Sequence, residues 1–350
     1  MQRVRRVGAG IVTGEERQHL ATVPDTPKSR RRVADRPAGS PILPVRPISS
    51  YLLLQRGGDG TTMQKLLRTC YAIYCRSFLH PHLGGLIKRS LRFRNRFVAN
   101  GPFVHDLGAF RMNLDLAQLI DTSIYYMGTF EAACIAAIRR HLPVHGVAVD
   151  VGANIGFMTM HMATEVGRSG RVFSFEPTSW TYDKLAANLA LNVMPQVVTE
   201  RGALGAGSAT HVDLMVPYSY PLVGDRPVMR DTIVITTLDD YFAQHPIERL
   251  DLIKCDTDGW EMDVFEGAME TIRRFRPALI LEVDQFGLAE HGRSAGELIA
   301  LLRGAGYQFF HEDDLRPFDD LEAAASRVTT DHKLDVVALH EDGPRTFVVH

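Results

Sequence analysis

Two kinds of apolar stretch alternate along the chain: short runs that end in glycine or a carboxylate, and longer stretches with apolar residues at helical spacing. Val147–Val151 is apolar apart from Asp150 and predicts a strand, and Ile155–Val166 predicts the helix that follows it. Arg171–Phe175 predicts a second strand, followed by a helix that begins at Thr178 or Ser179 and runs to Asn192. This alternation predicts an α/β fold with a mostly parallel sheet.

The same pattern continues in both directions from this unit. Upstream, helices are predicted over Asp115–Tyr126 and Phe130–Leu142, on either side of Gly128. Downstream, strands are predicted at Gln196–Arg201, Leu250–Cys255, Pro277–Val283, Tyr307–Phe310 and Leu334–Leu339. Helices are predicted through Val264 and Ala268 and over Ala295–Arg303. Two further strand-like pieces, within His211–Ile235, are interpreted as an insertion. These strands complete one sheet, so one main domain is expected.

The first hundred residues differ in charge from the rest of the chain. They hold 19 Lys and Arg against 5 Asp and Glu, although the net charge of the whole chain is only −2. Residues 1–62 are rich in Arg, Pro and Gly, so we expect a disordered extension, or translation upstream of a true start at Met63. The functional alternatives are a nucleic-acid arm, an organelle transit peptide and a tether to an anionic membrane.

Residues 63–125 are expected to form a helical accessory region that contains a denser basic patch, Lys88–Arg96. This patch either contacts phosphates of nucleic acid, lipid headgroups or a sugar nucleotide, or is an ordinary solvated face. Peripheral membrane contact through the basic N-terminal region is retained as a hypothesis.

Cysteine usage and hydropathy bear on the compartment. The four cysteines, at positions 70, 75, 134 and 255, show neither metal-ligand spacing nor a disulfide framework, which favours a reducing cytoplasm and no zinc site. The sequence contains neither a run of about 18 apolar residues nor the apolar core of a signal peptide. A soluble, cytoplasmic protein is therefore expected.

The turn after the first strand carries the most specific chemistry. A loop that binds a dinucleotide needs a middle glycine so that the backbone can approach the pyrophosphate, but Gly152-Ala-Asn-Ile-Gly156 has none. The sequence therefore favours a ligand with an adenosine but no pyrophosphate, S-adenosylmethionine. Asp150 is expected near its amino group, Asn154 in the loop, and Glu176, at the end of the second strand, on both ribose hydroxyls. A tight turn without a ligand is the plain alternative.

Carboxylates also follow two later strands. Asp256 and Asp258 come after the strand at Leu250–Cys255, and Glu282 and Asp284 end the strand at Pro277–Val283. Since the carboxyl ends of parallel strands meet at one edge of a sheet, where α/β proteins bind their ligands, these groups indicate one site.

These residues resemble the FkbM family of S-adenosylmethionine-dependent methyltransferases, from about Tyr126 to Leu339. The matching stretches are Asp150-Val-Gly-Ala-Asn-Ile-Gly156, Phe175-Glu-Pro177, Asn188-Leu-Ala-Leu-Asn192, Thr237-Leu-Asp239, Ile253-Lys-Cys-Asp-Thr-Asp-Gly-Trp-Glu261, Glu266-Gly-Ala268 and Leu281-Glu282. Members of the family mostly have glutamate at the position of Asp258 and an aliphatic or β-branched residue at that of Cys255. The shorter Asp258 side chain leaves the role of this position open.

The resemblance implies a class I methyltransferase fold: a doubly wound, mostly parallel seven-stranded sheet with one antiparallel strand. It also implies S-adenosylmethionine as methyl donor and O-methylation of a sugar or natural-product hydroxyl. The cofactor-binding domain is placed at residues 126–345. Glu131 is expected either over the cofactor or as an ordinary acid at a helix N-terminus, and the small residues around Ala203 are expected to let the adenine lie close to the backbone.

A base that takes the acceptor proton is expected on the strand at Leu250–Cys255. Strand alternation places Lys254 and Asp256 on one face and Cys255 on the other. Asp256 is therefore the candidate base, and Lys254 is expected either to orient the acceptor or to neutralise the developing alkoxide. Glu282 and Glu131 are the alternative catalytic carboxylates. Two other interpretations remain: a structural ion pair of Lys254 with Asp256, and a metal ion between Asp256, Asp258 and Glu282.

The sequence therefore predicts an S-adenosylmethionine-dependent O-methyltransferase for a carbohydrate or glycosylated small molecule. A nicotinamide-dependent oxidoreductase and a non-catalytic S-adenosylmethionine-binding module are the rivals. Nucleic acid is disfavoured as substrate, because no proline precedes Cys255 and no Asn/Asp-Pro-Pro-aromatic loop follows this strand. The sequence does not specify the oligomeric state.

Overall fold

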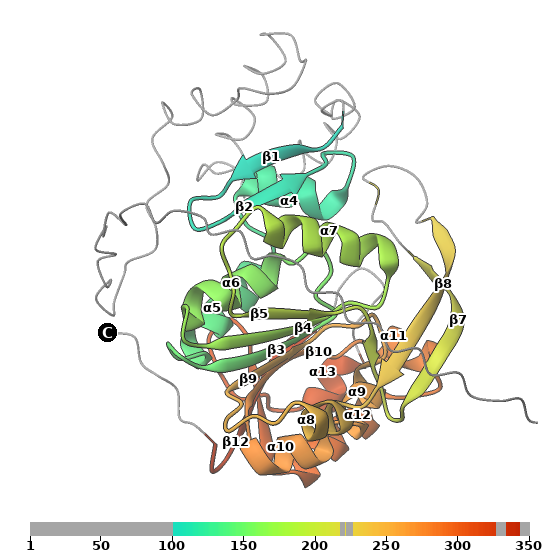
Figure 1. Ribbon diagram of the computed structural model, residues 1–350. Coiled ribbons are helices and arrows are strands. Elements are labelled where there is room, and N and C mark those ends of the chain that lie inside the picture. Colours follow the sequence, from blue (N-terminus) through green and yellow to red (C-terminus); the bar gives the residue numbers. More distant parts are fainter. Residues whose placement is uncertain (1–100, 218–220, 222–226, 327–333, 344–350) are drawn as a thin grey trace, which may run out of the picture. The chain divides into compact units, whose positions relative to one another are not determined.

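The computed structural model describes residues 101–217, 221, 227–326 and 334–343. Its centre is a seven-stranded sheet with the strand order β11-β12-β10-β9-β3-β4-β5 (Figure 1). The strands are β3 (Val147–Val151), β4 (Arg171–Phe175), β5 (Val197–Glu200), β9 (Leu252–Cys255), β10 (Ala278–Glu282), β11 (Tyr307–His311) and β12 (Asp335–His340). All neighbouring pairs are parallel except those that involve β12. This is the class I methyltransferase topology, and the predicted fold is confirmed.

Burial explains why the central strands were recognisable. Every residue of β9 and β10 is buried, and only the first residues of β3 and β4 are not. A parallel sheet covered on both faces selects such continuous apolar runs. Strand order reverses between β3 and β9, and α/β proteins bind their ligands beyond the carboxyl ends of the strands at such a reversal.

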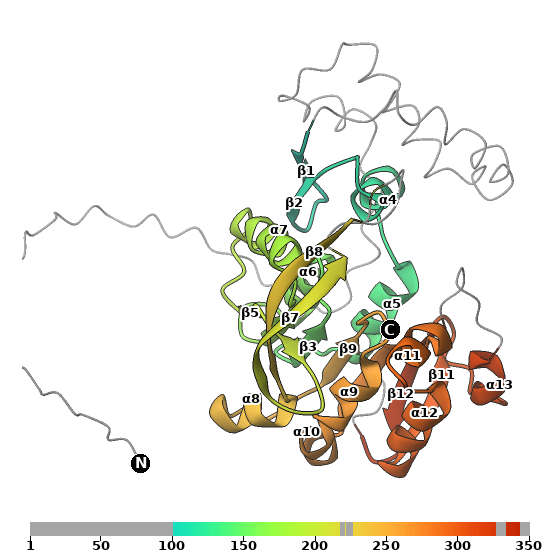
Figure 2. The same ribbon diagram turned by 90° about the vertical axis from the view of Figure 1, so that its right-hand side faces the viewer.

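Helices pack against both faces of the sheet (Figure 1 and Figure 2). One face packs against α5 (Ala132–His141), α6 (Phe157–Val166) and α7 (Ser179–Ala190), and α4 (Leu119–Met127) adds apolar residues to the same core from beside the N-terminal strands. The other packs against α8 (Leu238–Gln244), α9 (Glu261–Glu266), α10 (Met269–Phe275), α11 (Gln285–Glu290), α12 (Ala295–Gly304) and α13 (Leu321–Ala325). Each face therefore has its own apolar core, and the sheet separates the two.

Part of the region expected to be helical is a β-hairpin. Strands β1 (Phe103–Asp106) and β2 (Arg111–Leu114) pair antiparallel, and the first helix that the structure describes begins at Leu119. The turn is made by Asp106, whose carboxylate accepts a hydrogen bond from Gly108 N at 2.7 Å. Met112 and Leu114 are buried while Arg111 is exposed, which is the alternation expected of a strand. The prediction of a helical region did not take this alternation into account.

The insertion predicted within His211–Ile235 is present. Strands β7 (Ala209–Pro217) and β8 (Val228–Thr236) form an antiparallel pair, and the two-residue strand β6 (Ala203–Leu204) adds to β8 in parallel. The three strands form a separate small sheet.

One predicted helix is divided into two. Helix α9 ends at Glu266 and α10 begins at Met269, because the chain turns at Gly267. A Cβ atom at Gly267 would lie 2.0 Å from the carbonyl oxygen of Gly205, so only glycine fits where the two backbones meet.

Several expectations concern residues outside the described part of the chain. These are the extension at residues 1–62, most of the accessory region at 63–125, and the basic patch at 88–96. Among the residues that the structure describes, no helix is both long and apolar enough to cross a membrane.

Candidate active site

The glycine loop after β3 is held to the end of β4 by backbone hydrogen bonds. Gly152 N and Ala153 N both donate to Phe175 O, each at 3.0 Å. Gly152, Asn154 and Gly156 have left-handed φ values of 74°, 49° and 89°. Such values at three of five positions turn the chain sharply between the strand and α6.

Glu176 organises this loop from the end of β4. Its Oε2 accepts from Asn154 N and its Oε1 from Thr178 N, both at 3.0 Å. Burial raises the pKa of Glu176 to about 7, against the lowering effect of these hydrogen bonds. A carboxylate has about four acceptor sites. Two backbone donors therefore leave room for a ribose diol, and the predicted ribose contact fits the geometry.

Asp150 lies below the loop and is fully buried. Its Oδ2 accepts from the Thr159 hydroxyl at 2.6 Å, and its Oδ1 lies 3.9 Å from Lys254 Nζ. Burial raises the pKa of Asp150. The predicted contact of Asp150 with the cofactor amino group stays a prediction; among the described residues, Asp150 Oδ1 receives no hydrogen bond.

Lys254 connects buried Asp150 to Asp256 at the mouth of β9. The Lys254 Nζ atom lies 3.3 Å from Asp256 Oδ2, and the Asp256 side chain is 30% exposed. Burial disfavours the charged amine, but Asp256 and Asp150 together hold the pKa of Lys254 well above its usual value. The two residues are neighbours as predicted, and Cys255 faces the opposite core. Asp256 can thus accept a proton from a group that approaches from solvent.

Two further carboxylates lie beside Asp256. The carboxylate oxygens of Asp256, Asp258 and Glu282 lie within 4.8 Å of one another, close enough to share a cation. Asp258 has a φ of 53°. The carboxylate of buried Glu261 holds the turn, because its Oε1 accepts from Thr257 N at 2.7 Å and from the Thr257 hydroxyl at 2.8 Å.

Residues 150–309 match the family model of the methyltransferase FkbM domain. The chain carries a methyltransferase domain of the FkbM family. The matched region contains the glycine loop, Glu176, the Lys254–Asp256 pair and Glu282. The cofactor of this domain is S-adenosylmethionine.

Curated relatives match parts of the chain. The AMB antimetabolite synthetase AmbE of Pseudomonas aeruginosa is 29% identical over 234 residues, 55% of this chain and 11% of the relative. The methyltransferase sdnD of Sordaria araneosa is 24% identical over 210 residues, 49% of this chain and 78% of the relative. Among solved structures, a methyltransferase FkbM from Methylobacillus flagellatus KT matches with a TM-score of 0.35 and 15% identity, over 62% of this chain and 52% of that one. The chain thus spans about a tenth of the first relative and about half of this solved chain.

The remaining predicted residues of the FkbM domain site lie on other elements. Glu131 is the exposed N-cap of α5 and has a φ of 49°, a strained value for a residue other than glycine. Its negative charge helps to raise the pKa of Lys254, which lies at the carboxyl edge of the sheet. Ala203 lies on the small β6 strand and is half-buried. The structure therefore brings Asp150, Lys254, Asp256 and Glu282 together directly, with Ala203 on a separate sheet.

Glu312 is a residue of this edge that the sequence reading missed. It follows β11 and is 9% exposed. Its Oε1 receives no hydrogen bond from any described residue. Burial, together with the charges of Asp335, Glu131 and Asp313, raises the pKa of Glu312 to about 8. An acid immediately after a strand was the available signal, but the prediction ended that strand at Phe310.

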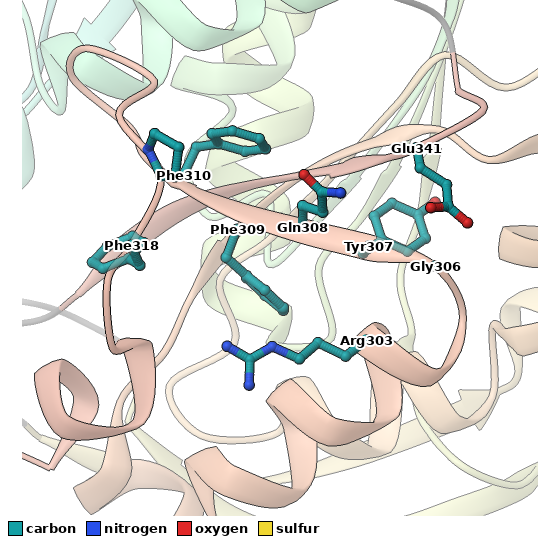
Figure 3. A pocket seen from close by; sticks show the side chains of 9 residues that line it. Arg303, Gly306, Tyr307, Gln308, Phe309, Phe310, Phe318 and Glu341 are labelled. Carbon is teal, nitrogen blue, oxygen red and sulfur yellow. The ribbon is translucent and has the colours of Figure 1, made fainter.

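A separate hollow of about 450 Å³ lies along the outer edge of the sheet. Residues on both sides of β11 line it, among them Arg303, Tyr307, Phe309 and Phe318 (Figure 3). The predicted active-site residues are not among its lining residues.

Proposed function

We propose that the protein is an S-adenosylmethionine-dependent O-methyltransferase for a hydroxyl of a carbohydrate, glycolipid or other hydroxylated natural product. The observation that carries this proposal is the Lys254–Asp256 pair, which holds a partly exposed carboxylate beside the cofactor loop. Such a carboxylate is suited to receive a proton from a weakly acidic hydroxyl.

S-adenosylmethionine supplies a methyl group already activated by a sulfonium. The task of the protein is to hold the acceptor oxygen in line with that methyl group and to exclude water. Asp256 would take the hydroxyl proton as the acceptor oxygen attacks the methyl carbon, so that the methylated oxygen ends neutral. Lys254 would orient the acceptor and offset the partial negative charge that develops on the oxygen as the proton leaves.

Exposed aromatic rings support a carbohydrate acceptor. Trp260 is 44% exposed and stacks on His291 with ring centroids 3.8 Å apart, and Phe286 is 51% exposed. A Cβ atom at Gly259 would lie 2.4 Å from the backbone of Gly287, so the two segments that carry Trp260 and Phe286 touch. Flat aromatic faces beside carboxylates suit the apolar face and the hydroxyls of a sugar ring.

Calorimetry with S-adenosylhomocysteine and with NAD, in separate titrations, tests the cofactor. We expect binding of S-adenosylhomocysteine alone. Incubation with S-adenosylmethionine and a panel of sugars, glycosides and glycosylated small molecules then tests the reaction, with mass spectrometry to detect O-methyl products. Asp256→Asn is the matched inactive variant. Full cofactor affinity without turnover on any acceptor would favour the non-catalytic binding module instead.

A further inference from the structure

Trp260 presents a flat apolar surface at the carboxyl edge of the sheet. It is the N-cap of α9, the helix that follows β9 and its turn. One face of the indole stacks on His291, with ring centroids 3.8 Å apart and the two planes 29° from parallel. Because 44% of Trp260 is exposed, the exposed surface belongs to the opposite face and the rim of the indole. The edge of the sheet that carries the candidate base therefore also carries an aromatic face.

The turn between the candidate base and Trp260 has a fixed conformation. Asp258 and Gly259 have left-handed φ values of 53° and 106°, which turn the chain sharply. The carboxylate of buried Glu261 closes this turn, because its Oε1 accepts from Thr257 N at 2.7 Å and from Gly259 N at 3.3 Å. A molecule that lies on the indole is thus held at a set position relative to the carboxylate of the base.

A second segment supports the aromatic face from α11. A Cβ atom on Gly287 would lie 3.0 Å from the Cα atom of Gly259, so the two backbones pack directly on each other. Beyond α11, Arg293 Nη2 donates to Asp263 Oδ1 at 2.8 Å and to Glu266 Oε2 at 2.7 Å, both on α9. A single exposed apolar residue is common on protein surfaces. Here the two stacked rings lie on segments that are joined on both sides, which fixes the orientation of the indole in advance.

We propose that Trp260 determines the acceptor specificity by stacking on the ring of a sugar, so that the methylated hydroxyl belongs to a glycoside ring and not to an open-chain polyol. This inference rests on the proposed function, since it places the ring on the indole and one of its hydroxyls at Asp256. A pyranose ring carries C–H bonds on its faces and hydroxyls around its rim. The negative face of an indole attracts such C–H bonds, while the hydroxyls stay available to polar groups.

Tryptophan fluorescence gives the proposal a readout other than methylation. The chain has two tryptophans, Trp180 and Trp260. Trp180→Phe leaves Trp260 as the only tryptophan and keeps an aromatic ring beside Lys184, whose Nζ lies 5.1 Å from the centre of the Trp180 ring. A sugar ring that stacks on Trp260 replaces water on the indole, so it changes the emission of this variant.

The experiment uses the full chain with Trp180→Phe, in complex with S-adenosylhomocysteine. Methyl β-D-glucoside, methyl β-D-galactoside and methyl α-D-mannoside are titrated into it, beside the matching open-chain polyols D-glucitol, galactitol and D-mannitol. We expect at least one glycoside to change the emission of Trp260 to saturation. Its polyol should bind at least about tenfold more weakly, because it has similar hydroxyls but no ring face to stack.

Two variants distinguish stacking from simple apolar contact. Trp260→Phe keeps a flat ring and should retain most of the affinity for the glycoside, measured by calorimetry. Trp260→Leu keeps apolar bulk without a flat face, so its affinity should fall at least about tenfold. In methylation of the same glycoside, Trp260→Leu should raise KM and change kcat by less than about twofold, whereas Asp256→Asn should lower kcat. Affinity for S-adenosylhomocysteine should stay unchanged in both Trp260 variants.

Val193→Ala is the control, because it removes a 75% exposed apolar side chain beyond the end of α7. It should behave as the unmodified chain. Unchanged emission with every glycoside, equal affinity for a glycoside and its polyol, or equal affinity of Trp260→Phe and Trp260→Leu would overturn the proposal. So would emission that depends on protein concentration together with a dimer in sedimentation, since a second copy would then cover the indole.

Failure of the proposed function would look different. A glycoside that binds through Trp260 but is never methylated would support the binding site and count against the proposed reaction. If S-adenosylhomocysteine does not bind, the cofactor assignment fails, and the same glycoside titrations on the free protein still decide the role of Trp260.

Discussion

A Cβ atom on Gly152 would lie 1.9 Å from the carbonyl oxygen of Asp256. The loop expected to hold the cofactor and the residue expected to take the acceptor proton are thus in backbone contact. Asp256 N also donates to Val151 O, at 3.2 Å. Any change that pushes the glycine loop away from β9 therefore displaces the candidate base as well.

Gly152→Ala tests this contact. The left-handed φ of 74° and the collision with Asp256 both oppose a side chain. We expect the free energy of unfolding to fall by about 2 to 4 kcal/mol, and binding of S-adenosylhomocysteine to be lost or greatly weakened. Urea unfolding and calorimetry measure the two effects.

Gly207→Ala is the matched control, since a Cβ atom there would meet no other atom within 4 Å. It should change the free energy of unfolding by less than about 0.5 kcal/mol. If Gly152→Ala is as stable as Gly207→Ala, the loop and β9 are not in contact.

Glu176 predicts a pH dependence of cofactor binding. Burial raises its pKa to about 7 in the folded protein, whereas the unfolded value is about 4.3. Its contribution to stability is therefore fully present below about pH 4 and is lost as pH rises through about 7. The ionised form accepts ribose hydroxyls better, so affinity for S-adenosylhomocysteine should increase from about pH 6 to pH 8.

Glu176→Gln should remove this dependence and weaken binding at pH 8 by at least about tenfold, because charge-assisted hydrogen bonds are lost. The control is Asp183→Asn, an exposed acid on α7. Affinity that rises with pH equally in Glu176→Gln would assign the titration to another group.

The parallel strands of the sheet were predictable because strands that are buried on both faces consist of consecutive apolar residues. Val147–Val151 and Arg171–Phe175 were predicted with the bounds that the structure shows. The hairpin at residues 103–114 was missed, since its strands have only four residues each and Phe103–Asp106 does not alternate. The break at Gly267 was missed because its cause, Gly205, lies far away in the sequence.

The site was predictable where its functional side chains lie at or just after the carboxyl end of a predicted strand. Lys254 and Asp256 are two residues apart on one strand, so alternation alone places them together. Burial was not predictable in the same way: Asp150 is closed off by Thr159 of α6, a contact that depends on packing. Glu312 joins the site through β12, a strand that comes later in the chain and pairs in the opposite direction.

Asn188 of α7 connects the β1–β2 hairpin to the glycine loop, and its replacement tests how much this connection stabilises the fold. Its Nδ2 donates to Ile155 O at 2.9 Å, and its Oδ1 accepts from Asn113 N at 2.7 Å. Because the side chain is fully buried, Asn188→Ala leaves two polar backbone groups without partners. The free energy of unfolding should fall by about 2 to 4 kcal/mol.

Asn192 makes similar bonds to the backbone of Arg111, but at a more exposed position. Water can replace its side chain, so Asn192→Ala should cost clearly less than Asn188→Ala in the same urea unfolding experiment. Equal losses would show that burial does not decide the strength of this attachment.

Variants of the Lys254–Asp256 pair distinguish a catalytic role of these two residues from a structural one. Asp256→Asn keeps the size and most hydrogen bonds of the side chain but removes its basicity. If Asp256 takes the acceptor proton, turnover should fall by ~10² to 10⁴, with little change in affinity for S-adenosylhomocysteine. Lys254→Met should also slow turnover, and the double variant should be little worse than the poorer single variant, as expected of residues that act as one unit.

A purely structural ion pair predicts a different pattern for the same three variants. Each single change would lower the melting temperature, and turnover would fall only in step with the folded fraction. Single-turnover methylation of an acceptor identified in the panel, measured beside thermal unfolding, distinguishes the two. Repeating both with EDTA tests for a cation held by Asp256, Asp258 and Glu282, since its removal would slow the unmodified protein too. If Asp256→Asn retains most of its activity in folded protein, the base must be sought at Glu282 or Glu131, and Lys254 then serves to hold the mouth of β9 in place.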